Sequence, residues 1–206
     1  MPSPAKGLTQ PERLEISGRK LLEAAVALIG EKGWEATSAA EIGRRAGYSR
    51  AMVHARYGNK DAILQTLFAT EYEKKLSPDP DPDSTGLAQA LAHLDRISLL
   101  YAEDREVLRA IFVLTFEAAK ATSQAHPYIQ MWLRRAAHTV ESGLRTGIDD
   151  GSVRADIDIE HTVNDFGATV LGIGYQWVMQ AFPYDMADEL VHVRARFIRE
   201  YGSAAD

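Results

Sequence analysis

The sequence contains no cysteine, which excludes structural disulfides, thiolate nucleophiles and cysteine-based zinc sites. It also lacks the run of ~18 consecutive apolar residues that a membrane-spanning helix needs. The longest apolar stretch, 166–179, is interrupted by three glycines and a glutamine. Residues 1–9 hold no apolar run, so we expect no secretory signal, no membrane partner and a cytoplasmic location.

Motifs that carry catalysis are missing as well. We find no nucleophile elbow, no phosphate-binding glycine loop in a strand context and no paired-carboxylate site. The six histidines show no clustered ligand spacing. We therefore expect no enzymatic activity, no bound metal and no cofactor.

Charge is distributed unevenly along the chain. The net charge of −6 argues mildly against binding to nucleic acid. However, residues 1–60 hold ten Lys and Arg against six Asp and Glu, whereas residues 61–206 hold thirteen against twenty-three. A basic N-terminal part can gain free energy by displacing counterions from phosphates. Chance clustering is the alternative explanation.

Apolar residues recur at steps of three and four along most of the chain, and no strand pattern is convincing. The pattern predicts an all-α fold of about nine helices. We place them at about 13–32, 39–46, 50–57, 60–75, 85–102, 104–121, 127–149, 158–181 and 186–201. Alternating prolines in residues 77–84 predict a semi-rigid loop.

Three short helices in the N-terminal part predict a helix-turn-helix. Ser38 with Glu41 forms a capping-box signature, and Gly47 ends the helix that follows. Ser49 caps the next helix, which Gly58 ends. These are the proportions of a helix-turn-helix with a glycine in its tight turn.

The chain is expected to have three parts. Several prolines and a glycine predict a flexible arm over residues 1–12. Residues 13–61 then form a three-helix DNA-binding domain, and residues 62–206 form a helical effector-binding and dimerisation domain.

A series of short motifs occurs at fixed spacing between residues 21 and 61. They are Leu21-Leu22-Glu23-Ala24-Ala25, Gly30-Glu31-Lys32-Gly33-Trp34-Glu35-Ala36-Thr37-Ser38, Glu41-Ile42-Gly43, Ala46-Gly47-Tyr48-Ser49 and Tyr57-Gly58-Asn59-Lys60-Asp61. This stretch strongly resembles the DNA-binding domain of TetR-family transcriptional regulators. Further along, residues 151–156 resemble the family's usual entry to its dimer-forming helices.

The resemblance implies that the third helix enters the major groove and that the fourth begins at a phosphate. It implies base or phosphate contacts for Arg50, Ala51, Met52 and His54, and backbone proximity for Arg56, Tyr57 and Lys60. His54 and Arg56 stand where the family usually has aromatic residues, so the operator sequence cannot be taken from another member.

General physics supports several of these contacts. Arg50, at the start of the recognition helix, can bond bidentately to guanine. Met52 can touch a thymine methyl group. Lys60 lies at a helix N-terminus, which favours a phosphate. The capping serines Ser38 and Ser49 complete the candidate DNA-binding set. Val53 and Tyr57, four residues apart, can instead be core residues.

The resemblance also implies a ligand pocket and a dimer interface in the C-terminal part. Aromatic and other large side chains there are candidates for lining a pocket for an apolar or planar effector. They are Tyr101, Phe112, Phe116, Tyr128, Met131, Trp132, Phe166 and Tyr175. Each can equally be an ordinary core residue.

Apolar stripes on the last two helices predict a four-helix dimer interface. The stripes are Val163, Phe166, Val170, Ile173 and Trp177, then Leu190, Val193, Phe197 and Tyr201. Helix-turn-helix proteins read two half-sites by two-fold symmetry, which favours the dimer over burial within one chain.

Together these features predict a ligand-responsive transcriptional regulator, acting as a repressor. It would bind a palindromic double-stranded DNA operator as a homodimer and be released by a small molecule. The alternatives are a helical small-molecule-binding or interaction module without DNA binding, and a small-molecule enzyme on a helical scaffold.

Overall fold

The computed structural model describes residues 9–81 and 83–203, and this part of the chain is helical. Its elements are α1 (Gln10–Lys32), α2 (Ala39–Arg45), α3 (Arg50–Tyr57), α4 (Lys60–Leu67), the π-helical segment η1 (Phe68–Tyr72), α5 (Glu73–Leu76), α6 (Gly86–Glu103), α7 (Arg105–Glu117), α8 (His126–Asp150), α9 (Ile159–Met179) and α10 (Met186–Tyr201). Because α4, η1 and α5 run on without a break, the described residues form nine continuous helices. One isolated bridge, between Val153 and Gly202, is the β pairing in this part of the chain. The all-α prediction is confirmed.

Local signals place most helix ends. Ser38, Ser49 and Asn59 each accept a hydrogen bond from the backbone N–H of the third residue of the helix they precede. The expected start of the first helix at Arg13 was wrong, since Thr9 caps α1 in a capping box with Glu12. Pro11 lies in the first turn, where its missing N–H costs nothing. Most of the arm predicted for residues 1–12 lies outside the described residues.

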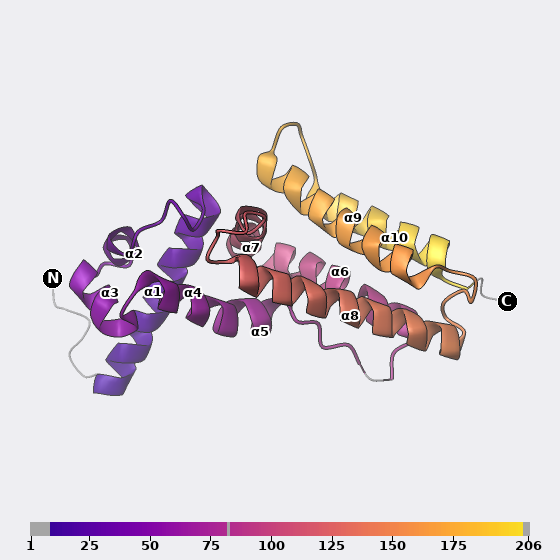
Figure 1. The fold of residues 1–206 in the computed structure, drawn as a ribbon, viewed down its shortest axis with the longest axis horizontal. Helices are drawn as coiled ribbons and strands as arrows, with labels where there is room; N and C mark the ends of the chain where they lie inside the picture. The colour runs from indigo at the N-terminus through magenta and orange to yellow at the C-terminus, as the bar shows by residue number, and fades with distance from the viewer. Residues whose placement is uncertain (1–8, 82, 204–206) are drawn as a thin grey trace.

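Figure 1 shows two groups of helices along the long axis of the molecule. We call α1–α4 the head and α6–α10 the body. In the body, α6 packs along α8, and α9 and α10 lie together on one side. Helix α7 contacts both α1 and α9 and so connects the two groups. No helix in the described part is long and apolar enough to cross a membrane.

Small residues allow α6 and α8 to cross closely. A Cβ added to Gly86 would lie 1.9 Å from the backbone nitrogen of Gly147, and one added to Gly143 would lie 2.5 Å from that of Ala90. No side chain fits at such distances. This helix pair is therefore held in one register by backbone contact.

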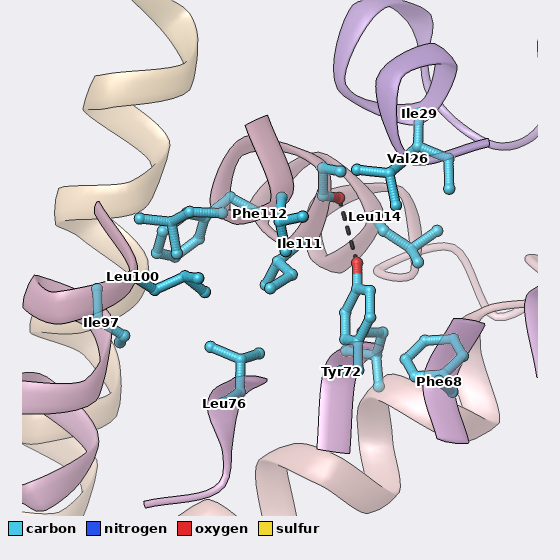
Figure 2. Packing of buried hydrophobic residues seen from close by; sticks show 14 of the residues in the cluster. Val26, Ile29, Phe68, Tyr72, Leu76, Ile97, Leu100, Ile111, Phe112 and Leu114 are labelled. Atoms are coloured by element: carbon cyan, nitrogen blue, oxygen red, sulfur yellow. Dashed lines mark hydrogen bonds between the residues drawn. The ribbon is translucent and has the colours of Figure 1, made fainter. Parts of the chain in front are cut away.

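A continuous apolar core passes from the head into the body. Figure 2 shows its middle part, where Val26 and Ile29 of α1 lie near Leu114 of α7. The buried hydroxyl of Tyr72 donates a hydrogen bond of 3.2 Å to the carbonyl oxygen of Ala110. The segment η1 is thus tied to α7 at the junction of head and body.

Candidate nucleic-acid interface and interior cavity

The helices α2 and α3 meet at Gly43. A Cβ there would lie 3.0 Å from the carbonyl oxygen of Tyr48 and 3.1 Å from that of Ser49. Gly47 follows with a φ of 80°, a left-handed conformation that glycine adopts without strain. Two glycines therefore set the angle at which α3 leaves α2, one by close approach and the other by backbone conformation.

Helix α3 leaves most of its side chains in solvent. Arg50, Ala51, Met52, His54 and Arg56 are exposed, whereas Val53 is buried, as its core assignment predicted. Within the described residues Arg50 has no ion-pair partner. An exposed helix with a free cation in its first turn has the shape and charge to enter a major groove.

Both capping serines are exposed next to this helix pair. The Ser49 hydroxyl accepts from the Met52 N–H at 3.2 Å. The Ser38 hydroxyl donates to the Glu41 carboxylate at 2.7 Å, and Lys32 donates to the same carboxylate at 2.6 Å. Together these bonds hold the pKa of the Glu41 carboxyl at about 2. The carboxylate therefore stays charged and neutralises Lys32, so this lysine adds little to the positive field of the head.

Three residues expected to face the DNA backbone have partners inside the chain. The Lys60 ammonium donates to the carbonyl oxygen of Trp34 at 2.5 Å and lies 4.3 Å from the centroid of the Trp34 ring. Burial lowers the pKa of Lys60. Although Lys60 lines a groove of about 750 Å³ with Arg50, Ala51 and His54, its charge is directed toward Trp34.

Tyr57 and Arg56 pack on α1. The Tyr57 hydroxyl donates to the carbonyl oxygen of Gly18 at 3.2 Å, and burial raises the pKa of Tyr57. A Cβ on Gly18 would lie 3.2 Å from the Arg56 guanidinium. Their sequence positions indicated proximity to DNA but not these internal contacts, because the contacting residues lie far away along the chain.

The body encloses a cavity of about 90 Å³ between α6, α7, α8 and α9. Its walls are mainly apolar and include Ile97, Ile111, Phe112, Trp132, Val140 and Phe166. An adjoining groove shares three of its lining residues, which are Thr115, Leu133 and Leu171. An apolar molecule could therefore extend from the cavity into the groove.

His93 is a buried polar residue of this cavity and was not among the predicted pocket residues. Its side chain is 8% exposed, and burial lowers the pKa of His93 to about 4. In the described part of the chain, its Nε2 is the one buried side-chain nitrogen or oxygen without a hydrogen-bond partner. A signal was present: His93 lies in the apolar stripe of α6 with Ala90, Ile97 and Leu100, at steps of three and four.

The structure brings together only part of the predicted pocket set. Phe112, Trp132 and Phe166 line the cavity, and Phe116 and Tyr175 line the adjoining groove. The other three lie elsewhere. Tyr101 packs edge-on to Trp177 at 5.5 Å, Tyr128 stacks on Phe68 at 4.8 Å, and Met131 is 45% exposed.

Comparison with known proteins assigns the head. The family model described as "Bacterial regulatory proteins, tetR family" matches residues 21–67. The head therefore resembles the helix-turn-helix of TetR-family regulators over these residues, and α3 lies where such a motif has its second helix.

Similarity extends over the body at the level of the fold. A curated relative, the fatty acid metabolism regulator protein of Bacillus subtilis (strain 168), is 21% identical over 170 residues, covering 81% of this chain and 86% of that protein. A TetR-family transcriptional regulator from Agrobacterium tumefaciens superposes with a TM-score of 0.75 at 18% identity, covering 92% of this chain and all of that one. The SmeT–triclosan complex gives 0.71 at 21% identity, covering 92% and 93%. SmeT is described as the repressor of the multidrug efflux pump SmeDEF of Stenotrophomonas maltophilia.

The TetR-like fold buries the apolar stripes that we had assigned to a dimer interface. In α9, Phe166, Ile173 and Trp177 are buried, and Val163 and Val170 line the cavity. In α10, the residues turned inward are Leu190, Val193 and Phe197, with Tyr201 half-buried. Phe166 and Phe197 pack edge-to-face at 5.3 Å within the one chain. These stripes are intrachain contacts, and the assignment to a dimer interface is corrected accordingly.

Helix α7 connects the cavity with the TetR-like head. Arg109 donates to the carbonyl oxygen of Gly30 in α1 at 3.1 Å and to that of Val178 in α9 at 3.3 Å. At the end of α7, the Glu117 carboxylate accepts from the backbone N–H groups of Trp34 at 2.6 Å and Glu35 at 3.3 Å. Since α7 also supplies Ile111, Phe112 and Thr115 to the cavity, a shift of this helix reaches both places.

Proposed function

We propose that this protein is a ligand-responsive transcriptional repressor that binds a palindromic operator as a homodimer. Residues 13–61 form its DNA-binding domain, and residues 62–206 bind the effector and the second subunit. It acts in the cytoplasm, with the DNA it regulates, and has no catalytic role. The TetR-family head and the solvent-exposed face of α3 are the observations that carry the proposal.

Arg50, Met52 and His54 would read base edges, with Arg50 at a guanine. Ala51 lets the backbone of α3 approach the groove. Ser49 would donate its exposed hydroxyl to a phosphate, whereas Ser38 would do so only if DNA draws its hydroxyl from the Glu41 carboxylate. Arg56, Tyr57 and Lys60 support α3 from behind and contact the phosphates only if DNA draws them from their internal partners.

Effector release would act through α7. A molecule in the cavity contacts α7 at Ile111, Phe112 and Thr115. A displacement of α7 moves Glu117, which holds the backbone at Trp34 in the connection between α1 and α2. The two recognition helices of a dimer must reach half-sites about 34–36 Å apart, or a multiple of that, so a small movement weakens binding. Effector binding would then lower the affinity for DNA, and DNA binding would lower the affinity for the effector by the same factor.

The second copy would pack on the outer faces of α9 and α10. Large apolar side chains are exposed there: Tyr175 (51%), Met179 (55%), Val191 (71%) and Ile198 (40%). Val191 and Ile198 are two helical turns apart and so share a face. A two-fold pairing of these faces gives a four-helix interface.

Oligomeric state tests this interface directly. We expect size-exclusion chromatography with light scattering to report a dimer for the wild type and a monomer for Val191→Asp. Leu99→Asp is the matched control, because Leu99 is similarly exposed but lies on α6. A dimeric Val191→Asp protein would contradict the proposed interface.

DNA binding is tested by fluorescence anisotropy with random-sequence duplex at several salt concentrations, followed by selection of tight sites from a random pool. We expect binding that falls steeply with salt and a selected sequence with two-fold symmetry. Absence of binding at low salt would reject the proposal in favour of a helical module without DNA binding. Transcription from the selected operator then distinguishes repression from activation.

A further inference from the structure

His93 of α6 is one of the lining residues of the cavity, whose walls are otherwise mainly apolar. Its Nε2 is buried next to this space and has no hydrogen-bond partner among the described residues. Two other lining side chains carry a polar group: Thr115, whose hydroxyl already donates to the Ile111 carbonyl oxygen at 2.8 Å, and Trp132, whose indole N–H can only donate. A buried, unpaired nitrogen is unfavourable, so a ligand that supplies its hydrogen bond gains affinity at this point.

The state of the imidazole restricts the chemistry of such a ligand. Burial lowers the pKa of His93 to about 4, so the ring is neutral at neutral pH. A neutral imidazole has one nitrogen that donates and one that accepts. A hydroxyl group both donates and accepts, and therefore satisfies Nε2 whichever of the two roles this nitrogen has.

The walls restrict the charge of the ligand. The described residues that line the cavity include no Lys, Arg, Asp or Glu. An ionised group placed there would lose its hydration without gaining a counter-charge, which is costly. The cavity therefore selects an uncharged molecule.

The size of the cavity restricts the shape. At about 90 Å³ it is smaller than the ~150 Å³ cavity that holds a benzene molecule. A ring thus fits only if the lining gives way, and a tail can continue past Thr115 and Leu133 into the adjoining groove. Occupation of both spaces would press on α7, which contributes Thr115 to each.

We propose that the effector is an uncharged, mainly apolar molecule with one hydroxyl group, a phenol or an alcohol, and that the Nε2 atom of His93 is its polar anchor. The inference rests on the proposed function only in treating the cavity as the effector site. The hydroxyl bonds to Nε2, and the apolar remainder occupies the space between Phe112, Trp132 and Phe166.

Three probes that differ in one group test this proposal: 4-propylphenol, propylbenzene and 4-propylbenzoate. Their affinities are measured by calorimetry on the full chain without DNA, for the wild type, His93→Leu and His93→Gln. We expect the wild type to bind the phenol about tenfold more tightly than propylbenzene, the gain typical of one hydrogen bond to a buried group. The benzoate should bind most weakly.

The variants separate the anchor from the cavity. His93→Leu should lose the preference for the phenol and bind propylbenzene at least as tightly, because the phenol hydroxyl is then buried without a partner. Its binding of propylbenzene shows that the cavity remains. His93→Gln should keep part of the preference, since its amide reaches a similar distance. A phenol preference that persists in His93→Leu, or a wild type that prefers the benzoate or binds none of the probes, overturns the proposal.

A second pair of variants tests the location. Gly167 lines the cavity, and a Cβ added there meets no atom within 4 Å, so Gly167→Leu should fill the space and lower phenol affinity at least about tenfold. Gly172→Leu is the matched control on the same helix, since its Cβ also meets nothing and it does not line the cavity. Equal affinities of the two variants would place the phenol elsewhere. The DNA-binding assay is independent, so its failure would reject the proposed function and leave these affinities interpretable.

Discussion

The unsatisfied histidine predicts how stability depends on pH. In the unfolded chain His93 has an ordinary pKa near 6.5, whereas burial lowers the pKa in the folded protein to about 4. Between these values the unfolded state binds more protons than the folded state. Stability must therefore rise with pH in this window and fall on acidification from pH 6.5 to 4.

The magnitude follows from the two pKa values. Each pKa unit corresponds to about 1.4 kcal/mol, so His93 contributes about 3 kcal/mol of destabilisation by pH 4. Above pH 7 the contribution is zero. Because the side chain is 8% exposed, solvent screening reduces this figure little.

Urea unfolding of the wild type and His93→Leu at a series of pH values measures the effect. At pH 7 the variant should be more stable by about 1–3 kcal/mol, since it removes an unpaired buried nitrogen. At pH 4 this advantage should have grown by about 3 kcal/mol. All other titrating groups are common to both proteins, so the difference isolates His93. A stability difference that stays constant from pH 7 to pH 4 would refute the reasoning, because the folded ring would then titrate as it does in water.

Three further changes test the head and its connection to the body. Arg50→Ala should weaken operator binding by about 1–3 kcal/mol and relax preference at one base position; equal weakening on every operator variant would make Arg50 a phosphate contact. Gly43→Ala should lower DNA affinity, because its methyl group meets two carbonyl oxygens at 3.0 and 3.1 Å; circular dichroism checks folding, and Gly172→Ala, with open space and outside the cavity, is the control. Glu117→Gln should reduce the effect of an effector on operator affinity, since a weaker acceptor holds Trp34 and Glu35; unchanged coupling in a binding titration would exclude this route.

Helix positions were predictable because the signals that set them are local. Ser38 and Ser49 bond to N–H groups three residues away, and Gly47 and Gly58 adopt positive φ where their helices end. Such interactions need no knowledge of the remaining fold. The family motifs of residues 21–61 added the expectation that α3 enters the major groove. Arg50, Met52 and His54 were predicted to contact DNA; the structure leaves them exposed, and the contacts themselves stay a prediction.

Contacts between distant residues could not be predicted in this way. Lys60 was expected at a phosphate, but its ammonium lies on Trp34, and Tyr57 bonds to Gly18, 39 positions away. Neither partner is marked by any local pattern. The predicted pocket set was partly wrong for a similar reason. Helical spacing does not distinguish a large side chain in the core, such as Tyr128, from one on the surface, such as Met131, or from one that lines a cavity.

The sequence by itself determined the helices, the caps and glycines of the helix-turn-helix, and the basic character of the N-terminal part. Tertiary structure decided what each apolar stripe packs against. A period of 3.6 residues identifies the apolar face of α9 or α10, but burial within one chain and burial between two chains satisfy that pattern equally. Only the packing of Phe166 on Phe197 showed that the stripes turn inward. Only the tertiary structure showed that the Nε2 atom of His93 is buried without a hydrogen-bond partner among the described residues.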